Sequence, residues 1–390
     1  MNVKTIRKDT PGCEGRLFFN SAGSSLPPKV VVDSMINFLK EEEIYGGYEM
    51  EVRRAADLWD FYLETARLLQ TNARNIAFAY NATDAFARAL SAIPFNSGDS
   101  ILTTNDDYIS NQINFLSLQK RFGLCVLRVP NLSSGDLDLE QMEALLKVHH
   151  PKLVAVTHIP TNSGLVQDVE AVGRLCRQFS TFYLVDGCQS LGQMELDVEK
   201  IGCDFLSATG RKFLRGPRGT GFLFVSDRIL EEGLEPLFID MRGATWKSAN
   251  EYVHEKDARR FELWENPYSA MVGLKEAIRY ANELGMGQIV EYNRTLIDAL
   301  RKGLGSLPGI ELLDRGSAKS NIVTFHKEGM PLSVLQEALT AQNVVFSVSK
   351  LENARIDFEN KGVEGAVRVS PHYFNTIEEA ENLMGIIASI

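Results

Sequence analysis

The chain alternates between short apolar runs and longer segments in which apolar residues recur with helical spacing. Apolar runs closed by turn residues predict buried strands at 76–80, 152–158, 182–185 and 222–225, and one more that ends at Asp106-Asp107. Helical spacing predicts helices at 30–40, 52–70 and 267–304. Beyond Leu307 the pattern predicts strands at 322–326, 344–348 and 366–369 and helices at 332–342 and 377–387.

Two polar residues lie where predicted strands meet loops. Asp186 ends the run 182–185, and Lys212 follows 26 positions later, before the turn Gly216–Gly221 and the strand 222–225. We expect this acid and this lysine to meet at one edge of a sheet. The pair suits pyridoxal phosphate, because a lysine forms a Schiff base with its aldehyde and a carboxylate holds a proton on its ring nitrogen. The alternative is an ordinary α/β protein with a surface lysine and a strand-end aspartate.

Length and composition limit the class of protein. The 390 residues allow about two or three domains, and the net charge of -10 gives no basic surplus for nucleic acid or an anionic membrane. No apolar run reaches the roughly 18–20 residues of a membrane span, and the polar N-terminus lacks a signal-peptide core, so a cytoplasmic protein is expected. Five widely spaced cysteines predict neither disulfides nor a metal site.

The spacing of the strand-end residues carries a family resemblance. Asp186-x-x-Gln189, the segment 207–211 before Lys212 and the following Gly-Pro-Arg-Gly resemble the class V aminotransferases, which are fold-type I pyridoxal phosphate enzymes. The resemblance implies an aspartate aminotransferase-like α/β fold, with a mainly parallel seven-stranded sheet in a large domain and a small α+β C-terminal domain. It divides the chain into an N-terminal segment contributing to the small domain, the large domain, and a connecting helix with the small domain, at 1–30, 31–265 and 266–390. It also implies a homodimer with shared active sites.

The turn after the strand 76–80 is a candidate phosphate site. Free N–H groups at a helix start bind phosphate, and the resemblance places the cofactor phosphate at Ala82, Thr83 and Asp84, although a plain N-cap also explains Thr83 and Asp84. An acid beside a dianion must turn its carboxylate away, so only the backbone N–H of Asp84 is expected to help. The resemblance adds Thr209, Arg211 and, from the neighbouring subunit, Thr245.

The remaining candidate residues follow from the same resemblance. Lys212 is the Schiff-base residue, Asp186 the partner of the ring nitrogen, Gln189 that of the phenolic oxygen, and Tyr108 the residue that stacks on the ring. Thr161 and Asn162 are expected at the ring oxygen or the substrate carboxylate. Arg368 is expected to grip the α-carboxylate of an amino-acid substrate, and Ser24 to contact the substrate.

The C-terminal region distinguishes between the reactions of the family. A cysteine desulfurase needs a nucleophilic cysteine there, and residues 213–390 contain none. The region resembles the C–S lyases that cleave the sulfoxide conjugate of hercynylcysteine in ergothioneine synthesis. This implies β-elimination on a cysteine S-conjugate or its sulfoxide, with Lys212 as base and with pyruvate and ammonia as products. Another class V reaction (epimerase, aminotransferase or desulfurase-like) and a catalytically silent cofactor-binding protein remain as alternatives.

Overall fold

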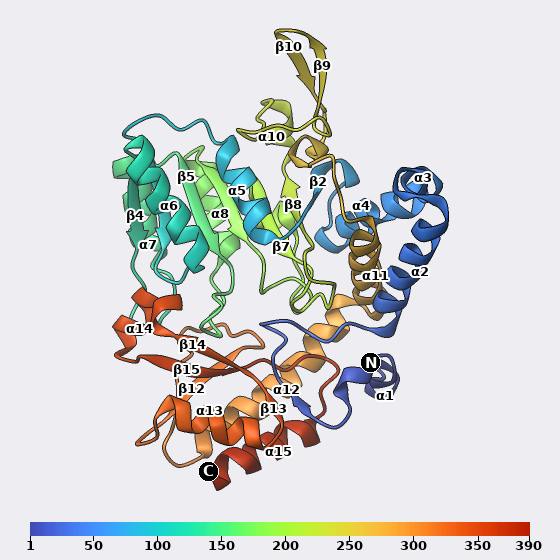
Figure 1. Ribbon diagram of the computed structural model, residues 1–390. Coiled ribbons are helices and arrows are strands. Elements are labelled where there is room, and N and C mark those ends of the chain that lie inside the picture. Colours follow the sequence, from blue (N-terminus) through green and yellow to red (C-terminus); the bar gives the residue numbers. More distant parts are fainter.

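A seven-stranded sheet forms the centre of the computed structural model, which describes residues 1–390 (Figure 1). Its strands lie in the order β2 (Ile76–Ala79), β8 (Gly221–Val225), β7 (Phe205–Thr209), β6 (Phe182–Asp186), β5 (Leu153–Thr157), β3 (Ser100–Thr104) and β4 (Cys125–Val129). The pairs from β7 through to β4 are parallel, whereas β8 runs antiparallel to both of its neighbours. The carboxyl ends of the parallel strands therefore share one edge.

Both faces of this sheet are buried, because its strands are apolar at nearly every position. Alternate strand residues belong to two separate apolar clusters, so that Leu184 packs on one face and Tyr183 and Val185 on the other. The first face is covered by α5 (Ala82–Ala92), α6 (Ile109–Phe122) and α10 (Asp227–Glu231). The second is covered by α4 (Ala55–Leu69), α7 (Leu139–His149), α8 (Val169–Gln178), α9 (Val198–Ile201) and α11 (Tyr268–Leu284).

A second, smaller sheet has a core of its own. The antiparallel strands β11 (Ile310–Leu312), β12 (Val323–Lys327), β15 (Gly365–Val369) and β14 (Ser347–Lys350) pack with α12 (Met286–Ser306), α13 (Leu332–Ala341) and α15 (Ile377–Ser389). The N-terminal strand β1 (Leu17–Phe18) pairs in parallel with β13 (Val344–Val345), so the two ends of the chain lie in this part of the molecule (Figure 1). Here α14 (Arg355–Lys361) follows β14.

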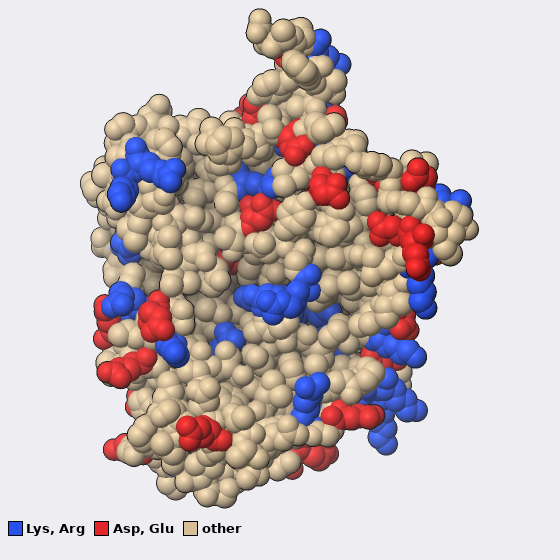
Figure 2. Space-filling model, in the orientation of Figure 1, with Lys and Arg blue, Asp and Glu red and all other residues tan.

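Three N-terminal helices and one hairpin lie at the periphery. The helices α1 (Val3–Lys8), α2 (Lys29–Tyr45) and α3 (Gly47–Arg53) belong to the N-terminal part, and the hairpin of β9 (Ala244–Ser248) and β10 (Glu251–His254) projects away from the body (Figure 1). In the space-filling view of the same face, acidic and basic side chains are interspersed (Figure 2). None of the helices is both long and apolar enough to cross a membrane.

The α/β fold with a mainly parallel seven-stranded sheet is confirmed. Two predicted elements differ in detail. The helix expected at 267–304 is two helices, because Gly285 has a φ of 82° and interrupts it. The strand expected at 344–348 is divided between β13 and β14, which pair in different sheets. The domain boundaries at residues 30 and 265 stay a prediction.

Candidate active site

A cavity of about 150 Å³ opens at the carboxyl edge of the parallel strands. In doubly wound sheets this edge is where ligands bind. Nine of the residues singled out in the sequence line it: Ala82, Thr83, Tyr108, Thr161, Asp186, Gln189, Thr209, Arg211 and Lys212. They come from five separate stretches of the chain, so it is the fold that brings them to one cavity.

Asp186 is the last residue of β6, and its carboxylate is held from two sides. Its Oδ1 accepts a hydrogen bond from the backbone N–H of Cys188 at 2.9 Å, and its Oδ2 accepts one from Asn111 Nδ2 at 3.1 Å. The side chain is buried. A carboxylate fixed in this way is oriented to meet a ring nitrogen without first having to reorganise.

Lys212 lies in the loop between β7 and β8 and is buried, with only 6% of its surface exposed. Burial lowers the pKa of its ammonium below the usual range, while Cys188 and Asp186 oppose that shift. Its Nζ lies 6.0 Å from the centre of the Tyr108 ring. The lysine faces the cavity, and its ammonium loses a proton more readily than that of a surface lysine.

The lysine loop is tied to the N-terminal segment by a buried arginine. The guanidinium of Arg215 donates to the carbonyl oxygen of Leu26 at 2.8 Å and to Thr10 Oγ1 at 2.5 Å. Its Cζ lies 4.9 Å from the Tyr373 ring centre and 4.8 Å from that of Phe374. These contacts fix the position of the loop three residues after Lys212.

The N-terminus of α5 supplies the candidate phosphate site. Ala82 and Thr83, in its first turn, line the cavity. A side chain at Gly221 would place a Cβ 2.4 Å from the carbonyl oxygen of Ala208 and 2.9 Å from the carbonyl carbon of Asn81, so only glycine allows this close approach. Free N–H groups and the helix dipole favour an anion here, and this cradle fits a phosphate.

Asp84 does not line the cavity. Its backbone N–H donates to the side chain of the N-cap residue Asn81 at 3.0 Å, and its carboxylate accepts from Arg88 at 2.7 Å. In this structure the N–H that was expected to bind phosphate thus has an intramolecular partner. Thr209 and Arg211 do face the cavity, and Arg211 also donates to the carbonyl oxygen of Gly23.

Arg368, on β15, is buried beside the cavity. Its Nη1 donates to the carbonyl oxygen and to the Oγ1 of Thr161, at 2.7 and 2.8 Å, while its Nε has no hydrogen-bond partner. Burial, aided by the charge of Arg211, lowers the pKa of Arg368 to about 10, so it stays protonated at neutral pH. A buried guanidinium with an unsatisfied N–H is suited to an incoming carboxylate.

Gln189 lines the cavity and shares a hydrogen-bond partner, Thr161, with this arginine. Its Nε2 donates to Thr161 Oγ1 at 3.0 Å and to the carbonyl oxygen of Ala22 at 3.1 Å, and its buried Oε1 has no partner. The amide is therefore held in place with one polar atom still unsatisfied.

Besides Asp84 and Arg368, three predicted residues lie outside the cavity lining. Asn162 donates from Nδ2 to Asp357 on α14 at 2.7 Å. Ser24 is half-buried, and its N–H donates to the carbonyl oxygen of Asn20 at 3.0 Å. Thr245 lies on β9 of the projecting hairpin and is exposed (Figure 1).

Five lining residues were not predicted as site residues: Asn81, Asn111, Thr157, Ile159 and Cys188. Thr157 ends β5 next to Asp186 on β6, so its place at the strand edge was a signal that could have identified it. Asn111 is more remote in the sequence, and only the fold places its amide against Asp186.

Comparison with known protein families identifies the family of this chain. The family model for aminotransferase class-V matches residues 17–383. The chain is a class V aminotransferase family member. Pyridoxal 5'-phosphate is the cofactor of this family, and the cavity described above fits it.

Relatives within this family cover nearly the whole chain. A probable cysteine desulfurase of Methanothermobacter thermautotrophicus is 29% identical over 98% of this chain and 96% of its own length, and one of Pyrococcus abyssi is 28% identical over 99% and 96%. The apo structure of a cysteine desulfurase from Thermococcus onnurineus NA1 superposes with a TM-score of 0.92 at 25% identity, covering 100% and 98% of the two chains. The cystine C–S lyase C-DES, at 20% identity, shares the fold, with a TM-score of 0.88 over 98% and 99%.

Proposed function

We propose that this class V enzyme is a carbon–sulfur lyase that eliminates the sulfur substituent of a cysteine S-conjugate or its sulfoxide. The observation that carries the proposal is the lack of a reactive thiol at a site similar to that of the desulfurases. Residues 213–390 contain no cysteine. The one cysteine that lines the cavity is Cys188, and burial and the neighbouring Asp186 raise the pKa of its thiol well above the usual range. A thiol that stays protonated is a poor sulfur acceptor.

The side chains of the site support an elimination. When bound, pyridoxal phosphate withdraws electrons from the substrate α-carbon and so makes its proton easier to remove. Lys212, whose pKa is lowered by burial, would accept that proton as general base. Asp186 would keep the ring nitrogen protonated, and the free Nε of Arg368 would bind the α-carboxylate. Breaking the β-carbon–sulfur bond then releases a sulfur product and aminoacrylate, which water hydrolyses to pyruvate and ammonia.

The remaining assignments belong to the same proposal. Gln189 would contact the phenolic oxygen of the cofactor, Tyr108 would stack on its ring, and Thr83, Thr209 and Arg211 would hold its phosphate. Thr245 would reach the phosphate of a second copy, because its hairpin projects away from the body of its own chain. We therefore propose a homodimer in which each site is completed by the other subunit.

A screen of cysteine S-conjugates and their sulfoxides, followed by pyruvate release, tests this function. We expect stoichiometric pyruvate and ammonia from conjugates with a good sulfur leaving group, and none from the matched variant Lys212→Ala. Alanine, which has no β-leaving group, serves as the substrate control. Racemisation or amino-group transfer without pyruvate would instead favour the epimerase or aminotransferase alternatives. Cofactor binding without turnover of any substrate would favour a silent protein.

A further inference from the structure

Behind the Asp186 carboxylate lies a second buried carboxylate, that of Asp107, which the reaction above does not use. Asp107 is 8% exposed and follows β3. One amide links the two acids, because Asn111 Nδ2 lies 3.1 Å from Asp107 Oδ1 and 3.1 Å from Asp186 Oδ2. The two carboxylates are therefore neighbours on opposite sides of a single donor.

Asp107 is surrounded by donors that carry no charge. It accepts hydrogen bonds from Thr103 Oγ1 at 3.0 Å, from the backbone N–H of Tyr108 at 2.7 Å and from Gln112 Nε2 at 2.8 Å, and a further one from Thr157 Oγ1. Burial raises the pKa of Asp107, and the donors Thr157, Gln112 and Asn111 oppose that shift. Arg128 is connected to Asp107 only through the amide of Gln112, to whose Oε1 its Nη2 donates at 2.7 Å.

We propose that Asp107 is a positioning residue, whose negative charge fixes the amide of Asn111 toward Asp186 and strengthens the hold of Asp186 on the proton of the cofactor ring nitrogen. A flipped amide would place Asn111 Oδ1 against two carboxylates, so Asp107 locks the orientation that donates to Asp186. The charge of Asp107 is separated from Asp186 by two contacts of 3.1 Å to one amide nitrogen. Screened by an effective dielectric of about 20, a charge this near raises the pKa of the ring-nitrogen proton held by Asp186 by roughly one to two units.

The inference rests on the cofactor site of the proposed function but not on the leaving group, so its test needs no substrate. The variant is Asp107→Asn in the cofactor-loaded enzyme, and the measurements are the pH dependence of the visible absorbance of the cofactor and the 15N chemical shift of its labelled ring nitrogen. We expect the absorbance midpoint to fall by about one to two pH units and the ring nitrogen to lose its proton at lower pH. The matched control is Thr103→Val, which removes one donor to Asp107 but keeps the charge, and it should leave both readouts unchanged.

A second variant keeps the inference testable if Asp107→Asn does not fold. Asn111→Ala removes the linking amide but leaves both acids, and it should shift the same two readouts. Wild-type absorbance midpoints and nitrogen shifts in Asp107→Asn or Asn111→Ala, even with reduced stability, would overturn the positioning role. Because these readouts are spectroscopic, a protein that never releases pyruvate would refute the lyase proposal without touching this one.

Discussion

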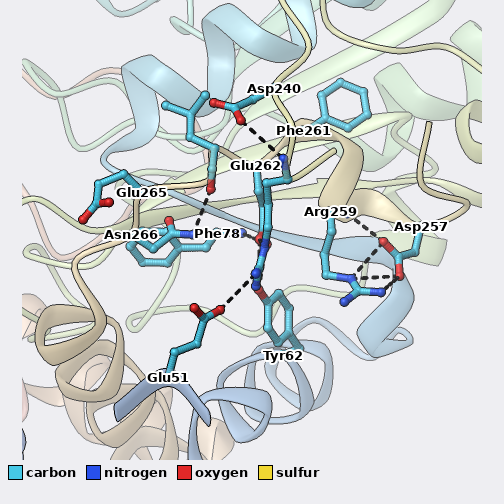
Figure 3. Close-up of polar contacts among 12 residues, drawn as sticks. Glu51, Tyr62, Phe78, Asp240, Asp257, Arg259, Phe261, Glu262, Glu265 and Asn266 are labelled. Carbon is cyan, nitrogen blue, oxygen red and sulfur yellow. Dashed lines mark hydrogen bonds and ion pairs between the residues drawn. The ribbon is translucent and has the colours of Figure 1, made fainter. Parts of the chain in front are cut away.

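Replacing Glu262 tests how much its buried carboxylate stabilises β2, the edge strand of the large sheet. The Glu262 side chain is fully buried and accepts from the backbone N–H of Phe78 at 2.8 Å, from the Tyr62 hydroxyl at 2.8 Å and from Arg242 Nε at 3.5 Å (Figure 3). Phe78 belongs to β2, the last strand of the sheet, so the carboxylate satisfies an N–H that has no further strand to pair with. Arg242 in turn binds Glu51 at 3.2 Å.

The expected loss of stability follows from the groups left without a partner. Glu262→Ala leaves the buried Phe78 N–H and Tyr62 hydroxyl unsatisfied, at about 1–3 kcal/mol each, and opens a cavity as well. We expect the free energy of unfolding to fall by roughly 3–5 kcal/mol. Glu262→Gln keeps an acceptor oxygen of the same size and loses only the charge toward the partly exposed Arg242, so it should cost about 1–2 kcal/mol.

The assay is urea denaturation at a fixed cofactor concentration, because a bound ligand adds to the apparent stability. The matched control is Glu251→Ala on the exposed strand β10, which should change stability by less than about 0.5 kcal/mol. If Glu262→Ala unfolded at the wild-type urea concentration, or if alanine and glutamine cost the same, the buried hydrogen bonds would not be what stabilises this edge.

Three further predictions concern the site and its surroundings. Arg368→Lys keeps a positive charge but loses the planar guanidinium that binds a carboxylate with two hydrogen bonds. We therefore expect kcat/KM for the S-conjugate to fall by about 10–100-fold, while the absorbance of the bound cofactor stays unchanged. An unchanged kcat/KM would exclude a role of Arg368 in binding the substrate carboxylate. Thr245→Ala should weaken cofactor binding by about threefold to tenfold while sedimentation still shows a dimer, and an unaltered affinity would mean that Thr245 does not reach the partner's site. Burial and Asp357 raise the pKa of Asp106 to about 7, above its unfolded value of about 4, so the folded state binds this proton more tightly and stability should decline as pH rises from about 4 to 7. Asp106→Asn should flatten that decline in urea titrations, and an equal slope in both proteins would contradict the assignment.

The sequence predicts the residues that carry the chemistry of the site better than it predicts the contacts that hold the neighbouring side chains. Asp186 and Lys212 were identifiable because a strand end and a loop fix their place before any tertiary contact is known, and both line the cavity. Asn162 has the right residue type at a neighbouring strand end, yet its amide binds Asp357, a residue almost two hundred positions later. A side chain that can make several hydrogen bonds is directed by whichever partner the fold brings near, and that partner is not visible in local sequence.

The same limit explains the phosphate turn. A helix start after a strand predicts free N–H groups, and Ala82 and Thr83 do line the cavity. Which of those groups stays free depends on the N-cap, and the Asn81 side chain occupies the N–H of Asp84. An N-cap competes with a ligand for the same donors, so the sequence predicted which turn borders the cavity but not how the donors are divided within it.

Positively charged side chains outnumber carboxylates in and beside the cavity, which favours the binding of an anionic cofactor. Arg211 and Lys212 line the cavity and Arg368 lies against it, whereas the only carboxylate in the lining is that of Asp186. The pKa of Arg368 is lowered by burial and by the charge of Arg211, which means that the two guanidinium groups repel each other. An arrangement that places like charges together in a buried region is unfavourable by itself. Under the proposed function, a dianionic phosphate and a substrate carboxylate would enter between them and offset this repulsion. The cofactor should therefore stabilise the fold more than its contact area alone would suggest, and its binding should weaken as salt screens the attraction.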